Sequence, residues 1–201
     1  NLKFVALTDF GPDLNNINNA FPSSDIKDTL PVVIKHLRQL YVAESEKFAH
    51  VTYFFNGGYD HPVNGEKRLM VPSPKVASYD QAPLMGARAI TSAIIKALTN
   101  KKFDVVVANF ANADMVGHTG NEEATIKAVE ATDKNLEKLI PAVLQKNGFL
   151  LITSDHGNME RVFDPMTGKP ETQHDPNPVP IYLIASEFKL KVKKEPQAVR
   201  E

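Results

Sequence analysis

The sequence places aspartate close to histidine in two short polar segments. Asp114 and His118 lie four residues apart in the first segment, and Asp155 and His156 are adjacent in the second. A third histidine, His174, lies in a later polar segment. Carboxylate oxygen combined with neutral imidazole nitrogen suits manganese, zinc or iron. Two such sets can hold two metal ions roughly 3.5–4 Å apart, as phosphoryl-transfer sites do. The residues therefore predict a metal site of this kind.

Each pair also has a simpler explanation. Asp114 can cap a turn, Asp155 can cap a helix, and the histidines can be ordinary loop residues with satisfied hydrogen bonds. For one pair alone the simpler interpretation is preferable, whereas three such segments together favour metal binding. Lys47 is a weaker candidate, because a lone lysine is normally a solvated surface charge. It becomes relevant only if the site handles phosphate, which requires a cation beyond the metal ions.

Apolar periodicity indicates the elements that position these segments. Short apolar runs predict strands at residues 2–7, 51–55, 103–109, 149–153 and 179–185, with an extended stretch at 69–74 and a loop at 13–19. Helical spacing predicts helices at residues 28–40 and 83–98, and a third helix that Asn121 caps. Helices that alternate with continuous apolar strands indicate an α/β fold with a mostly parallel central sheet and helices on both faces.

The polar segments fall where such a fold binds ligands. Asp114 and His118 follow the predicted strand at 103–109, and Asp155 and His156 follow the one at 149–153. His174 precedes the last predicted strand. Ligands of open α/β sheets collect at the carboxyl ends of the strands. We therefore expect the three segments to converge on one edge of the sheet.

The overall composition excludes several classes of function. The 201 residues include 23 basic and 24 acidic side chains, so the formal charge of -1 provides no field that would recruit nucleic acid or an anionic membrane. There is no cysteine, which excludes disulfides, thiolate zinc sites and cysteine nucleophiles. No apolar run approaches the ~20 residues of a membrane span. We expect a soluble, cytoplasmic protein that binds neither nucleic acid nor membrane.

The chain is expected to be one domain of a larger protein. Residues 1–201 are predicted to form a single α/β metal-binding domain, with residues 189–201 as a frayed tail. The first residue, Asn1, leads directly into an apolar run. This start indicates a fragment of a larger, two-domain enzyme.

Five segments resemble the cofactor-independent phosphoglycerate mutases of the alkaline phosphatase superfamily. They are residues 43–55, 72–80, 109–121, 153–160 and 177–180, and the motifs Asp-Met-Val-Gly-His-Thr-Gly and Asp-His-Gly-Asn are ordered and spaced as in that family. The resemblance implies an alkaline-phosphatase-like α/β fold that lacks its amino-terminal elements. It also implies a glycolytic enzyme that interconverts 3-phosphoglycerate and 2-phosphoglycerate through a phosphoserine, with two metal ions that are usually manganese.

The resemblance further implies roles for single residues. Those that resemble the ligands of one ion are Asp114, His118 and His174, and those that resemble ligands of the other are Asp155 and His156. Lys47 resembles the lysine that contacts the transferring phosphate. The family's nucleophilic serine and an aspartate of the second metal site belong to segments absent here. The chain alone is therefore expected to lack the mutase reaction, and its expected partners are phosphoglycerate and the missing amino-terminal segment.

Two other functions remain open at this point. Another metal-dependent phosphatase or phosphomutase of the same superfamily would share the Asp-His motifs but need not share residues 46–52. A non-catalytic metal-binding module would be consistent with the absent serine motif.

Overall fold

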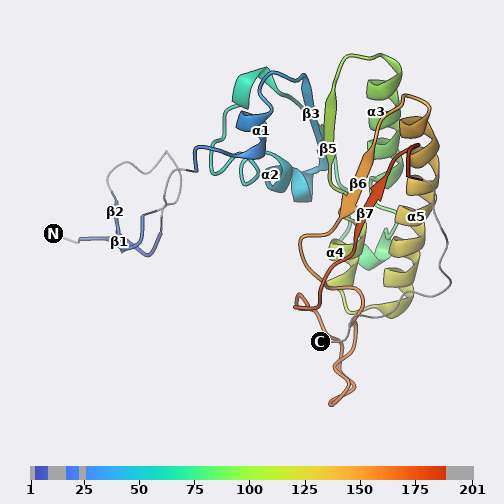
Figure 1. Ribbon diagram of the computed structural model, residues 1–201. Helices are drawn as coiled ribbons and strands as arrows, with labels where there is room; N and C mark the ends of the chain where they lie inside the picture. The colour runs from blue at the N-terminus through green and yellow to red at the C-terminus, as the bar shows by residue number, and fades with distance from the viewer. Residues whose placement is uncertain (1–2, 9–16, 23–25, 189–201) are drawn as a thin grey trace.

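The computed structural model describes residues 3–8, 17–22 and 26–188 (Figure 1). Its centre is a parallel sheet of three strands in the order β4 (Lys67–Val71), β3 (Gln39–Glu44) and β5 (Val105–Ala108). Val42 of the middle strand lies opposite Leu69 on one side and Ala108 on the other. Every residue of β3 is buried, as expected for the middle strand of a parallel sheet that is covered on both faces.

Helices lie on both faces of this sheet. The helices of the described chain are α1 (Leu30–Val33), α2 (Phe48–Val51), α3 (Ala87–Thr99), α4 (Asn112–Gly117) and α5 (Glu122–Leu144), of which α2, α3 and α5 pack on the sheet. Leu40 and Val42 of β3 pack with residues of α3 and α5, whereas Tyr41 and Ala43 pack with residues of α2. Successive side chains of a strand point to opposite faces of its sheet. Four consecutive residues of β3 therefore supply the cores on both faces.

Short turns and two further strand pairs complete the described chain. The turns are the 3-10 helices η1 (Ser45–Lys47), η2 (Val63–Gly65) and η3 (Tyr79–Gln81). The pairs are β6 (Leu150–Thr153) with β7 (Ile181–Ile184), which run antiparallel, and β1 (Val5–Ala6) with β2 (Asn18–Asn19), which run parallel. The predicted α/β class with a mostly parallel arrangement is confirmed, and the antiparallel pairing of β6 with β7 adds to it.

The long helix α5 follows the sequence prediction closely. The side-chain oxygen of Asn121 accepts a hydrogen bond of 3.1 Å from the backbone N–H of Ala124, which is the expected cap. Glu122 and Glu123 occupy the first turn, where the positive end of the helix dipole favours acidic groups. Because α4 and α5 are in contact, this helix also supports the segment that carries Asp114.

Two predictions between residues 28 and 55 are wrong. The helix predicted at 28–40 is the short α1, and Leu40 lies in β3, which the sequence analysis missed. The strand predicted at 51–55 is the end of α2 followed by turns. Pairing with β4 and β5 explains the first result, because a strand that forms both ladders outweighs weak helical spacing. Packing explains the second, since Val51 and Phe55 contact the sheet face around Tyr41 instead of extending it.

The amino-terminal predictions need a similar correction. Residues 2–7 were expected to form a buried strand. Residue 2 lies outside the described residues, and among residues 3–7 the strand spans Val5–Ala6, with Phe4, Val5 and Leu7 exposed. The predicted loop at 13–19 includes Asn18–Asn19, which form β2, and its residues 13–16 lie outside the described residues. The predicted tail at 189–201 also lies outside them.

Across the described ranges, no helix combines the length and the apolar character that crossing a membrane would require.

Candidate metal centre

The first part of the candidate site lies on α4, which follows β5. Asp114 is in the helix and His118 is its C-cap residue, and this spacing of four residues places both side chains on one face. The Oδ1 atom of Asp114 lies 3.1 Å from Nε2 of His118. Since α4 begins just beyond the carboxyl end of β5, the site lies at the sheet edge that the sequence analysis predicted.

A short backbone bridge holds together the loops that carry His156 and His174. The Gly157 N–H donates to the Asp175 carbonyl at 3.2 Å, and the Asp175 N–H donates to the Gly157 carbonyl at 2.8 Å. The neighbours of these two residues, His156 and His174, are therefore held together, and their rings stack with centroids 3.5 Å apart. The bridge thus joins two loops that are far apart in the sequence.

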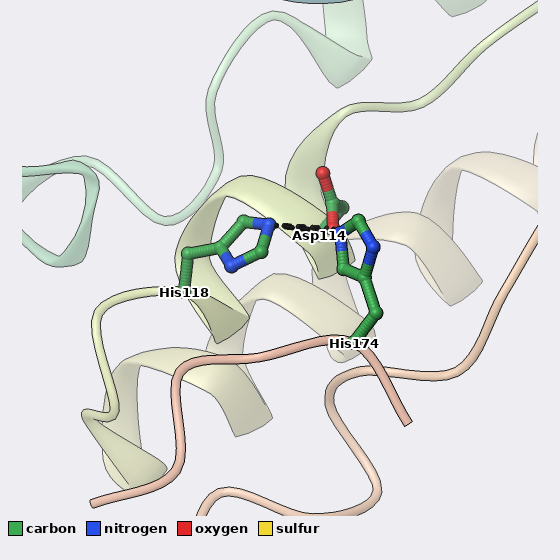
Figure 2. A group of neighbouring side chains, drawn as sticks. All are labelled: Asp114, His118 and His174. Atoms are coloured by element: carbon green, nitrogen blue, oxygen red, sulfur yellow. Dashed lines mark hydrogen bonds and ion pairs between the residues drawn. The ribbon is translucent and has the colours of Figure 1, made fainter. Parts of the chain in front are cut away.

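His174 completes a group of three possible metal ligands (Figure 2). Its Nε2 atom lies 3.3 Å from Oδ1 of Asp114 and 3.1 Å from Nε2 of His118. Figure 2 shows His118 entering from the end of α4 and His174 from the separate loop, with their rings turned toward the carboxylate. One carboxylate oxygen and two imidazole nitrogens are suitable ligands for a divalent transition metal.

A hydrogen bond supports the same interpretation of His118. Its Nδ1 atom lies 2.7 Å from the carbonyl oxygen of Thr172, a distance that fits an N–H donated to that oxygen. A neutral imidazole protonated at Nδ1 has a free lone pair at Nε2, the atom that faces Asp114 and His174. Metal-binding histidines are typically oriented by such a bond from the other ring nitrogen. The donor set therefore fits a metal ion.

Lys47 and Asn158 hold the carboxylate of Asp114. Lys47 follows β3 in η1, is only 8% exposed, and forms an ion pair with Oδ2 of Asp114. The amide of Asn158 donates to Oδ1 at 2.8 Å and to the Asp114 carbonyl at 3.3 Å. Burial raises the pKa of Asp114, but the hydrogen bonds from Lys47 and Asn158 outweigh it and leave that pKa below its ordinary value. Asp114 is therefore ionised at neutral pH.

Asp155 and His156 lie at the border of this group. Nε2 of His156 is 3.9 Å from Oδ1 of Asp114 and 3.5 Å from Oδ2 of Asp155. The Asp155 side chain is 62% exposed, so it faces solvent more than the Asp114 side chain does. The structure thus gathers all six residues named from the sequence, and their individual roles stay predictions. Lys47, which spacing alone assigned to the surface, is buried in the group.

Sequence reasoning missed two supporting features. Asn158 was not predicted to take part in the site, although its amide orients Asp114. Gly117 permits this contact, because a Cβ atom there would lie 2.5 Å from Oδ1 of Asn158. The position of Asn158 directly after the Asp-His-Gly motif was an available signal. Thr172 contributes a backbone carbonyl, for which side-chain patterns contain no signal.

Comparisons with known proteins agree with this geometry. The sequence profile of the Metalloenzyme superfamily matches residues 12–198. The chain belongs to the Metalloenzyme superfamily. Among the similar proteins, the 2,3-bisphosphoglycerate-independent phosphoglycerate mutase of Clostridium botulinum is 45% identical over 190 residues, covering 94% of this chain and 37% of that protein. The enzyme of the same name from Cyanothece sp. is 50% identical over 188 residues, covering 92% and 35%.

A solved structure is also similar. Phosphoglycerate mutase of Leishmania mexicana, crystallised at low cobalt concentration, has a TM-score of 0.79 and 34% identity to this chain. The match covers 92% of this chain and 36% of that structure. The chain thus spans little more than a third of the length of the relatives that it matches.

Proposed function

We propose that this chain is the metal-binding part of a 2,3-bisphosphoglycerate-independent phosphoglycerate mutase of the cytoplasm, acting in glycolysis. The observation that supports this most is the group of Asp114, His118 and His174, whose ligand atoms lie within 4.8 Å of one another. The names of relatives that are 45–50% identical over more than nine tenths of the chain supply the reaction. We propose further, from the family resemblance of the motifs, that the reaction interconverts 3-phosphoglycerate and 2-phosphoglycerate through a phosphoserine.

The proposed roles follow from the position of each residue. Asp114, His118 and His174 would hold one divalent ion, which we propose is manganese, and Asp155 and His156 would contribute to a second. Bound ions would lower the pKa of a serine hydroxyl and stabilise charge on a phosphoryl group. The ammonium group of Lys47 adds a cation at the same place, where it can bind a phosphoryl oxygen. The serine itself belongs to the proposed missing amino-terminal segment, so the 201-residue chain is expected to be inactive alone.

Metal binding is tested on the chain as it stands. Manganese titration calorimetry and elemental analysis would compare the wild type with Asp114→Ala and His174→Ala. His61→Ala serves as the matched control, because His61 is exposed and outside the metal-ligand group. We expect the wild type and the control to bind at least one ion, and both site variants to lose it. Equal binding by all four folded proteins would contradict the proposed site.

The mutase reaction is tested in a chimera. The matching 190 residues of the Clostridium botulinum relative would be replaced by this chain, and conversion of 3-phosphoglycerate to 2-phosphoglycerate would be measured. We expect activity in the chimera and none when it also carries Asp114→Ala. A folded, manganese-binding chimera that only hydrolyses phosphate esters would contradict the mutase proposal and favour a phosphatase of the same superfamily. A chimera that binds manganese without any reaction would favour a non-catalytic metal-binding module.

A further inference from the structure

A hollow of about 540 Å³ lies at the opposite edge of the three-stranded sheet from Asp114. Residues at or just before the amino ends of β3, β4 and β5 line it. Figure 1 shows the two ends of β5, with the loop from α3 at its upper end and α4 beyond its lower end. The hollow is therefore a different site from the candidate metal centre, and an inference about it does not depend on the proposed function.

The lining of this basic hollow is positively charged. It contains Lys35, Lys67, Lys101, Lys102 and Arg38, together with one histidine and no carboxylate. Arg38 is neutralised by the neighbouring Asp104 in an ion pair of 2.7 Å. The four lysines are exposed, and within the described part of the chain their ammonium groups have no ion pair.

This concentration of charge is local, because the whole sequence has 23 basic and 24 acidic residues. A set of like charges around one hollow creates a positive potential that attracts an anion. The lining residues supply no counter-charge, and Asp104 pairs with Arg38 only, so the hollow favours a ligand that carries negative charge.

The size and walls of the hollow indicate the size of that ligand. Its volume lies in the range of about 300–1,000 Å³ that is typical of small-molecule sites. Leu37 and Phe103 add half-buried apolar surface between the lysines. A ligand with several charges and a compact body fits this arrangement better than an extended polymer, for which cations would follow a groove.

The charge count indicates the chemical class. A phosphate monoester carries about -1.5 to -2 charges at neutral pH, so one such group matches at most about two lysines. Lysine binds phosphate as a point charge and needs no fixed geometry. We propose that the basic hollow binds a small molecule with two or more phosphate groups, such as a nucleoside diphosphate or triphosphate.

The test uses tripolyphosphate as the probe and orthophosphate as its single-phosphate counterpart. Calorimetric titration of the metal-free chain at low salt would compare the wild type with a Lys101→Gln/Lys102→Gln variant. The matched control is Lys75→Gln/Lys138→Gln, which removes the same charge from two exposed lysines outside the hollow. All four positions are exposed, so the variants are expected to fold, and circular dichroism would verify this.

We expect tripolyphosphate to bind the wild type more tightly than orthophosphate does. The Lys101→Gln/Lys102→Gln variant should weaken that binding by about tenfold or more, and the control by less than about twofold. Equal weakening in both variants would overturn the proposal, because it would show a general charge effect. Equal affinity for the two probes would overturn the multiphosphate class. Tighter binding of oligonucleotides, increasing with their length, would replace it with a nucleic-acid surface.

Discussion

Replacing Asn158 by alanine tests how the carboxylate of Asp114 is held for a metal ion. The Asn158 side chain is 5% exposed, and its amide donates a hydrogen bond of 2.8 Å to Oδ1 of Asp114. A hydrogen bond to a charged group contributes about 1.5–3 kcal/mol. Loss of a group that orients a metal ligand typically lowers metal affinity by about 10–100-fold. That range corresponds to about 1.4–2.8 kcal/mol, so the two magnitudes agree.

The assay is manganese titration calorimetry of the 201-residue chain. We expect Asn158→Ala to weaken manganese binding by about 10–100-fold without removing the site, because Asp114, His118 and His174 are still present. Asn177→Ala is the matched control, since Asn177 is exposed in the loop after His174 and only its backbone N–H bonds to Asp175. Unchanged affinity in a folded Asn158→Ala variant would refute the view that this amide orients Asp114.

Three further predictions concern stability. Gly157→Ala should cost about 1–3 kcal/mol in urea unfolding, because its Cβ would overlap the Glu160 carboxylate and lie 2.9 Å from the Asp175 carbonyl; a cost near zero would contradict this. Burial raises the pKa of Glu44 above the ordinary value of 4.5. The contribution of the Glu44 side chain to stability is therefore most favourable below pH 4.5 and is lost as pH rises through the folded-state pKa. Glu44→Gln should therefore be more stable than the wild type at neutral pH, by about 1–3 kcal/mol, with a smaller difference in acid, and thermal unfolding at both pH values checks the sign. Burial also raises the pKa of Tyr41 above the ordinary value of 10.0, so the wild type should lose stability as pH rises above 10.0. Tyr41→Phe should lose less stability over the same pH range in unfolding curves, and an equal loss in both proteins would contradict this prediction.

The sequence predicted the second half of the fold better than the first. Helix α5 was predictable because Asn121 supplies a local cap and the apolar side recurs with helical spacing. Strand β3 was not predicted, because the helical spacing of the apolar residues before it was extended through Leu40, although residues 40–43 are themselves a short apolar run of the kind that forms strands. The aromatic run at 51–55 has the composition of a strand, but Phe55 contacts Tyr41 instead, with ring centroids 5.8 Å apart.

The contacts of the candidate site were also only partly predictable from the sequence. Asp114 and His118 were predictable as neighbours because they lie four residues apart on α4. The approach of His174 depends on the bridge between Gly157 and Asp175, which is made by backbone atoms and is therefore not visible in residue types. The burial of Lys47 against Asp114 requires β3 to lie beside β5, so the missed strand also concealed this ion pair.

The most direct test of the central claim is an anomalous difference map from crystals of this chain grown with manganese. The account predicts a peak within bonding distance of Oδ1 of Asp114 and of the Nε2 atoms of His118 and His174. A well-ordered site without a peak there, or a manganese peak bound by other residues, would contradict it.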